Sequence, residues 1–86
     1  MITDEICLRL AKLNPTMIKV EDESQMHIGH AGSLQGGHYH LHIVSKCFSG
    51  LSLIERHRLI YDLLNDLMHN KIHALSIDAH TSTDNF

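Results

Sequence analysis

Residues 38–44 read His38-Tyr39-His40-Leu41-His42-Ile43-Val44, so that polar and apolar side chains alternate from His38 to Ile43. Successive side chains of an extended chain point to opposite faces, and strict alternation is therefore typical of a β strand with one buried face. The apolar face is formed by Tyr39, Leu41 and Ile43. The opposite face carries the histidines His38, His40 and His42.

Two further stretches, residues 17–23 and residues 72–79, alternate in the same way and predict two more strands. In the earlier one, the two faces are Ile18 and Val20 against Lys19 and Glu21. In the later one, the faces are His73, Leu75 and Ile77 against Ala74, Ser76 and Asp78. The segment from residue 24 to residue 37 has no apolar period and carries Gly29, Gly32, Gly36 and Gly37. That segment predicts a loop between the first two strands.

Two amphipathic helices are predicted around these strands. Thr3 is the expected N-cap of the first helix, and the Asn14-Pro15 pair ends it. Ser52, with Glu55 three residues later, forms a capping box that opens the second helix, which is expected to run to about Asn70. The apolar stripe of the second helix consists of Leu53, Ile60, Leu64 and Leu67.

The order helix, strand, strand, helix, strand predicts an α+β fold, in which helices pack on one face of a three-stranded sheet. A chain of 86 residues has room for one domain. We expect this domain to cover residues 1–80 and the remaining residues 81–86 to form a frayed, disordered tail.

Composition excludes several classes of protein. Apolar residues make up 43% of the chain and charged residues 20%, which is ordinary for a globular protein. The longest apolar runs are too short to cross a bilayer, and the N-terminus lacks a signal pattern, so we expect a cytoplasmic protein with no membrane contact. Cys7 and Cys47 lie far apart and match neither a C-x-x-C pattern nor a disulfide framework.

Six short segments carry a more specific signal in combination. They are Val20-Glu21-Asp22-Glu23-Ser24, His38-Tyr39, Val44-Ser45, Phe48-Ser49-Gly50, Arg56-His57-Arg58 and Ile72-His73-Ala74-Leu75. In this order, and over nearly the whole chain, the sequence resembles the BolA family. The resemblance implies an αββα(α)β order similar in topology to class II KH domains. It also implies a monothiol glutaredoxin as partner, a [2Fe–2S] cluster shared with it, and transcription-related roles in bacteria.

The resemblance further implies which residues bind the cluster. One ligand in the family is the histidine that opens the last strand, which corresponds to His73. The other comes from the loop between the first two strands, where His27 matches by its position and His30 is close enough to compete. Such a cluster needs four ligands, and a thiolate of the partner and glutathione would complete the set. We therefore expect the isolated chain to bind no cluster and to be a monomer or a weak homodimer.

The residues taken by themselves leave other interpretations open. His73 shares the parity of Leu75 and Ile77, which fits a histidine at the rim of the core. The three histidines of residues 38–44 could bind zinc together, but a solvated strand face is the better explanation. His57 falls on the apolar stripe of the second helix, where a hydrogen-bonded core histidine is expected.

The alternative function is DNA binding through the KH-like or helix-turn-helix surface. Its basic residues would be Lys46, Arg56, Arg58 and Lys71. The formal charge of −3, with nine neutral histidines, does not favour a phosphate backbone as partner. Catalysis is not expected, because the sequence has no Ser-His-Asp, paired-carboxylate or phosphate-loop pattern.

Overall fold

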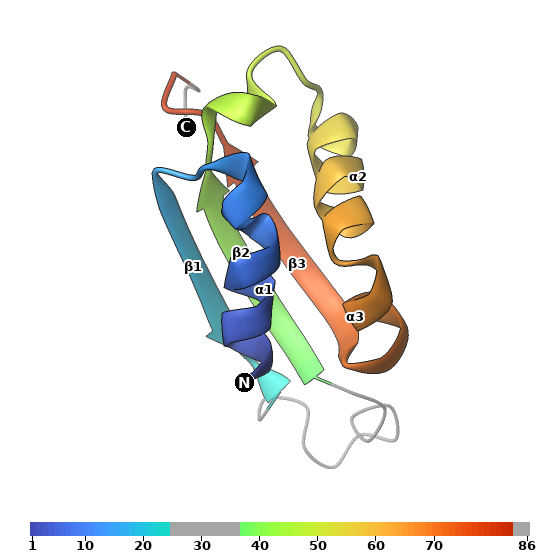
Figure 1. Cartoon of the computed structure of the whole chain (residues 1–86). Coiled ribbons are helices and arrows are strands. Elements are labelled where there is room, and N and C mark those ends of the chain that lie inside the picture. The colour runs from blue at the N-terminus through green and yellow to red at the C-terminus, as the bar shows by residue number, and fades with distance from the viewer. Residues whose placement is uncertain (25–36, 84–86) are drawn as a thin grey trace.

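The computed structural model describes residues 1–24 and 37–83, which form one sheet and one layer of helices (Figure 1). The α helices are α1 (Ile2–Leu10), α2 (Leu53–Leu63) and α3 (Asn65–Asn70). The strands are β1 (Met17–Asp22), β2 (Gly37–Val44) and β3 (Ile72–His80). Short 3-10 helices follow α1 and β2, namely η1 (Ala11–Leu13) and η4 (Lys46–Phe48). The predicted α+β class and the order of its elements are confirmed.

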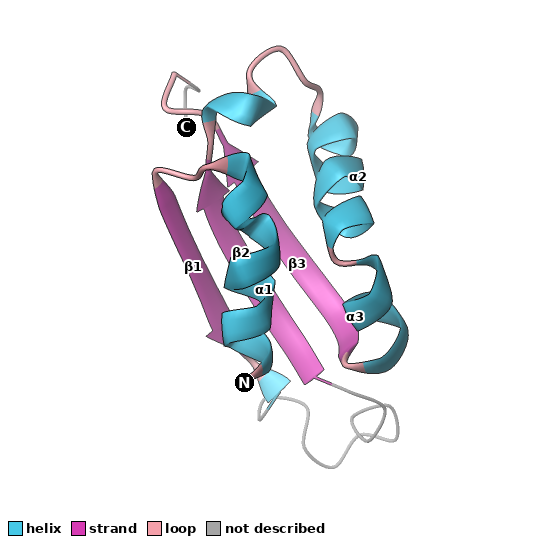
Figure 2. Ribbon diagram, in the orientation of Figure 1, coloured by secondary structure: helices cyan, strands magenta, loops and turns pink. Residues whose placement is uncertain are grey.

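The central strand of the sheet is β2, which pairs antiparallel with β1 and parallel with β3. Leu41 lies opposite Val20 on one side and opposite Ile77 on the other, so the apolar faces of the three strands coincide. All the helices cover this face, with α1 in front of β1 and β2 and with α2 and α3 beside β3 (Figure 2). Among the described residues, no helix covers the opposite face of the sheet, which we call the uncovered face (Figure 2).

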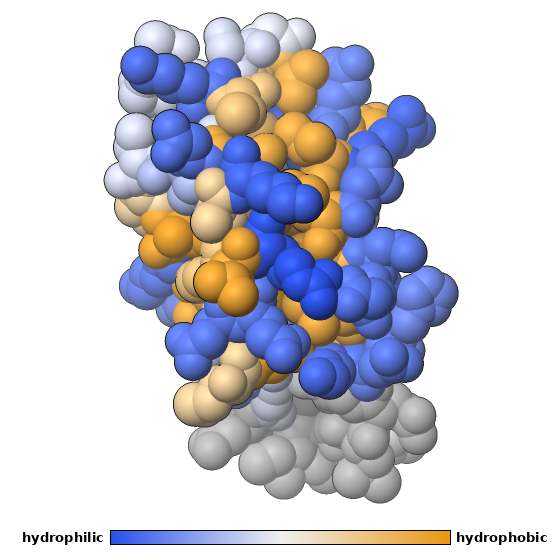
Figure 3. Space-filling model, in the orientation of Figure 1, coloured by the Kyte–Doolittle hydropathy of each residue, from blue (hydrophilic) through white to orange (hydrophobic). Residues whose placement is uncertain are grey.

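The hydrophobic core lies between this apolar sheet face and the helices. The sheet contributes Tyr39, Leu41, Ile43, Ile72 and Ala79. The helices and the segment after β2 contribute Ile6, Leu10, Leu13, Phe48, Ile60, Leu64 and Leu67. Seen from the helix side, hydrophobic residues remain visible between α1 and α2 (Figure 3). In the part of the chain that the structure describes, none of the helices has the length and apolar character of a membrane span.

The first helix begins earlier than predicted. Its N-cap is Met1, which makes no side-chain capping bond, so the predicted cap at Thr3 is wrong and Thr3 lies inside the helix. The end is as predicted: Asn14 adopts the left-handed conformation at φ 50°, which asparagine tolerates better than most residues. Pro15 then prevents any return to helix.

The second helix is divided in two, contrary to the prediction of one helix running to about Asn70. Leu64 leaves the helical conformation at φ −105° and ψ 10°, and α3 restarts at Asn65. The sequence gives no signal of this break: it contains neither Gly nor Pro there, and the apolar spacing continues from Ile60 through Leu64 to Leu67. The start of α2 also differs: the capping box of Ser52 and Glu55 is present, but Leu53 is 63% exposed and does not join the apolar stripe.

The segment predicted as a tail begins with a residue that packs onto the domain. Thr81 is 3% exposed, and its hydroxyl lies 3.0 Å from that of Thr83. Residues 84–86 lie outside the described residues. The predicted domain boundary at residue 80 stays a prediction.

An ion pair connects α1 to α3. The guanidinium of Arg9 donates two hydrogen bonds to the carboxylate of Asp66, one of them 2.8 Å long. These bonds hold the pKa of the Asp66 carboxyl at about 2, below its ordinary 3.8. A carboxyl whose pKa is lowered by folding stabilises the folded state above its ordinary pKa, and that contribution is lost as the pH falls through the folded value.

Asp66→Asn should therefore lower the stability of the domain at pH 7, and the difference from the wild type should shrink between about pH 4 and pH 2. Because both side chains reach solvent, high salt should also reduce the difference. Urea denaturation at several pH values measures it, with Asp62→Asn on α2 as the control. A difference that does not depend on pH would contradict the prediction.

Candidate functional site

His73 lies at the end of the sheet where β2 and β3 begin. The backbone N–H of Gly37 donates to the carbonyl of Lys71, and Gly37 lies opposite Ile72. At the same end, the N–H of His38 donates to the hydroxyl of Ser24 at 3.0 Å. The chain therefore leaves this end of the sheet at Ser24 and returns to it at Gly37, close to His73.

An extra residue interrupts the pairing of β3 with β2 at His73. Gly37 pairs with Ile72 and His38 with Ala74, so that His73 is passed over in the register. Ile72 is buried although its parity differs from that of Leu75, which also packs on the core. His73 is therefore exposed although its parity in the sequence matches that of Leu75 and Ile77.

A second imidazole lies beside His73. The ring centroids of His38 and His73 are 5.0 Å apart, with the ring planes tilted by 48°. His38 is the second residue of β2 and is half-buried. The other predicted ligands, His27 and His30, lie outside the described residues.

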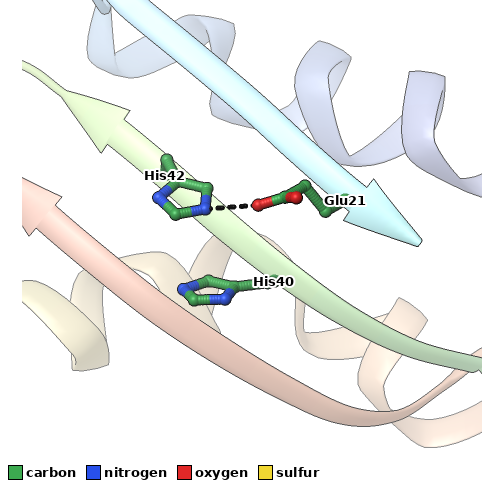
Figure 4. Close-up of side chains that lie close together, drawn as sticks. All are labelled: Glu21, His40 and His42. Carbon is green, nitrogen blue, oxygen red and sulfur yellow. Dashed lines mark hydrogen bonds and ion pairs between the residues drawn. The ribbon is translucent and has the colours of Figure 1, made fainter. Parts of the chain in front are cut away.

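The uncovered face of the sheet carries a second group of histidines with carboxylates around them. The side chain of His42 lies between Glu21 on β1 and Asp78 on β3, with its Nε2 2.7 Å from Glu21 Oε1 and its Nδ1 3.3 Å from Asp78 Oδ2. His40 stacks on His42 with the centroids 4.2 Å apart (Figure 4). The hydrogen bond to His42 lowers the pKa of Glu21, as does the charge of Lys19.

The basic residues proposed for DNA binding do not form one patch. Lys46 is exposed in η4, just beyond the end of β2. Lys71 is exposed just before β3, with its Nζ 3.8 Å from a carboxylate oxygen of Glu5. Because β2 and β3 run parallel, these two lysines lie at opposite ends of the sheet.

Arg56 is not a surface residue, contrary to the prediction of a basic edge. It is 8% exposed, and its guanidinium donates to the carbonyls of Leu51 and Ala79 at 3.1 and 2.9 Å. The same group lies 6.0 Å from the centroid of the Phe48 ring. Arg56 therefore joins the turn before α2 to the end of β3.

The prediction that the neighbouring His57 is a core histidine is also wrong. His57 is half-buried, and Arg56 is the buried residue. The spacing carries a signal for this arrangement. Arg56 precedes Ile60 by four residues and Leu64 by eight, which places all three side chains on one helical face. The helical spacing therefore favours a buried Arg56, against the predicted basic edge with Lys46 and Lys71.

Comparisons with known proteins agree with one another. The family model described as BolA-like protein matches residues 10–84. Over 80 residues the chain is 46% identical to SufE-like protein 1 of Arabidopsis thaliana, covering 85% of this chain and 21% of that protein. Over 85 residues it is 39% identical to the DNA-binding transcriptional regulator BolA of Vibrio cholerae, covering 98% of this chain and 78% of that one.

The solved structure of BolA1 from Arabidopsis thaliana superimposes with a TM-score of 0.84 at 37% identity, covering 98% of this chain and 95% of that one. The chain spans only 21% of SufE-like protein 1 and 48% of the chloroplastic BOLA1 protein of the same plant. The similarity to these longer proteins therefore concerns one domain of the first and about half of the second.

Arg56→Lys should lower the free energy of unfolding by roughly 2 kcal/mol, because one ammonium cannot replace both hydrogen bonds of a planar guanidinium. Urea denaturation measures this loss. The matched control is Arg58→Lys, two residues away at an exposed position, which should leave stability nearly unchanged. Equal stability of the two variants would show that the buried hydrogen bonds of Arg56 contribute little.

Proposed function

Because this chain belongs to the family of BolA-like proteins, we propose that it binds a monothiol glutaredoxin and contributes imidazole ligands to a [2Fe–2S] cluster held between the two proteins. The observation that carries the proposal is the position of His73, which is exposed at the end of the sheet where the chain leaves at Ser24 and returns at Gly37. The connecting residues 25–36, which include His27 and His30, lie outside the described residues, but both flanking residues, Ser24 and Gly37, lie at the end of the sheet where His73 lies.

The donor groups of the described residues suit a shared site better than a site within this chain. Cys47 is exposed but follows the far end of β2, away from His73. Burial raises the pKa of the Cys7 thiol, and the charge of Asp4 raises it further, which disfavours the thiolate that iron requires. The thiolates of the cluster would therefore come from the partner and from glutathione.

The residues of this chain would then act by supplying nitrogen on one side of the site. Replacement of thiolate by imidazole raises the reduction potential of a [2Fe–2S] cluster. His38 lies next to both flanks of this site. Its backbone N–H donates to the hydroxyl of Ser24, and its ring lies beside that of His73. Such a domain would be an adaptor for cluster transfer or iron sensing rather than an enzyme.

His73→Ala tests the proposal, because an exposed side chain is removed and folding should be unaffected. Anaerobic mixing of the wild type with a cluster-loaded monothiol glutaredoxin should change the visible circular dichroism and give an electron paramagnetic resonance signal typical of nitrogen ligation. The variant should lose these changes. His69→Ala, which removes an exposed histidine of α3, should keep them.

His27→Ala and His30→Ala, measured in the same way, identify the second ligand. The resemblance predicts that only His27→Ala alters the spectrum as His73→Ala does. If the His73→Ala complex gives the wild-type spectrum, His73 is not a ligand.

DNA binding by a transcriptional regulator is the second candidate, supported by the name of the Vibrio cholerae relative. The described structure favours it less, because Arg56 is buried and Lys46 and Lys71 lie apart. Titration of duplex DNA at neutral pH should therefore show weak binding that is lost with modest salt. Tight binding with a steep dependence on salt would favour the regulator instead.

The compartment in which the domain works is also part of the proposal. We propose the cytoplasm. The Arabidopsis thaliana relatives are named as chloroplastic or mitochondrial, so similarity alone does not decide the compartment. Fractionation of the native cells tests it directly.

A further inference from the structure

The uncovered face of the sheet brings together side chains from all three strands. Pairing between β1 and β2 places Glu21 opposite His40, and pairing between β2 and β3 places Asp78 opposite His42. His40 and His42 are two residues apart on one strand and therefore point to the same face. Two imidazoles thus stand in the middle of the sheet with a carboxylate on either side.

From this arrangement we propose that Glu21, His40 and His42 bind a divalent transition-metal ion, with Zn²⁺ as the preferred ion (Figure 4). The three side chains each offer one ligand atom, and these atoms lie within 4.8 Å of one another. Zinc holds nitrogen and oxygen ligands at about 2.0–2.2 Å in tetrahedral geometry, so two of its ligands lie about 3.3–3.6 Å apart. Small side-chain rotations would be enough to close the site.

The chemistry of the donor set selects the kind of ion. Two histidines and one glutamate are a known ligand set for zinc, with a fourth position left to water or substrate. Imidazole nitrogen suits zinc, nickel and copper, whereas calcium and magnesium require sites built mainly from oxygen. A site with two nitrogens and one oxygen therefore favours a transition metal over the two hard cations.

Asp78 is placed to support the ligands. Its Oδ2 lies 3.3 Å from Nδ1 of His42, the ring nitrogen that does not face Glu21. A carboxylate that accepts a hydrogen bond from the other nitrogen of a ligand histidine fixes the orientation of that ring in metal sites. Asp78 Oδ2 also lies 2.8 Å from Nε2 of His40. One carboxylate thus contacts both imidazoles.

The charges around the site also favour a cation. Glu21 and Asp78 carry two negative charges, and Lys19, which lies opposite His42, carries one positive charge. If the histidines are neutral, the charges of Glu21, Asp78 and Lys19 add up to one negative charge. All of the proposed ligands are half-buried or exposed, so an ion can reach them from solvent.

This site is separate from the proposed cluster site. His40 and His42 lie outside the six short segments that carry the resemblance in the sequence, and His73 takes no part in the contacts among Glu21, His40, His42 and Asp78. Failure of one proposal therefore leaves the other standing. The histidines of residues 25–36 are competing ligands that an experiment has to separate from this group.

The test is calorimetric titration of ZnCl₂ into the full, untagged chain near neutral pH, followed by the same titration with variants. His40→Ala combined with His42→Ala should lower the zinc affinity at least tenfold, and Glu21→Gln should lower it less. His73→Ala and His69→Ala are the controls and should bind as the wild type does. Because a ligand that binds only the folded state stabilises it, zinc should raise the Tm of the wild type but not that of the double variant.

A second measurement places the ion on the sheet even if a variant folds poorly. Histidine ring signals in nuclear magnetic resonance spectra of the wild type should show those of His40 and His42 shifting first as zinc is added. Wild-type affinity in the His40, His42 double variant would overturn the proposal. The same conclusion follows if zinc does not bind, or if His73→Ala abolishes binding.

Discussion

The alternation of side chains along β2 is the constraint on which the rest of the structure depends. As the central strand, β2 pairs with a neighbour on each side, and its apolar face is buried under the helices. A shift of one residue would bury three imidazoles and expose Tyr39, Leu41 and Ile43. The cost of burying unpartnered polar groups therefore fixes the register. The same constraint places every histidine of β2 on the uncovered face or at its end.

Parallel pairing of β2 with β3 requires a crossover, and α2 with α3 provides it. The crossover is held at its start by Arg56, which joins the turn at Leu51 to Ala79 at the end of β3. It finishes at the other end of the sheet, where β3 carries the extra residue at His73. Two of the segments that resemble the family thus differ in their role: Arg56 stabilises the fold, whereas His73 is exposed.

The two groups of histidines differ in what they offer to a metal. At the end of the sheet, the imidazoles of His38 and His73 lie side by side, and a second protein would have to supply the sulfur of a cluster bound there. On the uncovered face, His40 and His42 lie between Glu21 and Asp78, so oxygen and nitrogen come from one chain. The first arrangement suits a shared cluster, and the second suits a single ion.

The sequence by itself determined the elements, because alternation, helical spacing and the Ser52–Glu55 capping box are local patterns. Its resemblance to a family also singled out His73. Only the tertiary structure decided the rest: the break at Leu64, the burial of Arg56 and the exposure of His73. The burial of Arg56 depends on its hydrogen bond to Ala79, and the register at His73 depends on pairing with β2, so both involve residues far apart in the chain. The contact of His42 with both Glu21 and Asp78 is of the same kind, since strand order and register bring the three together.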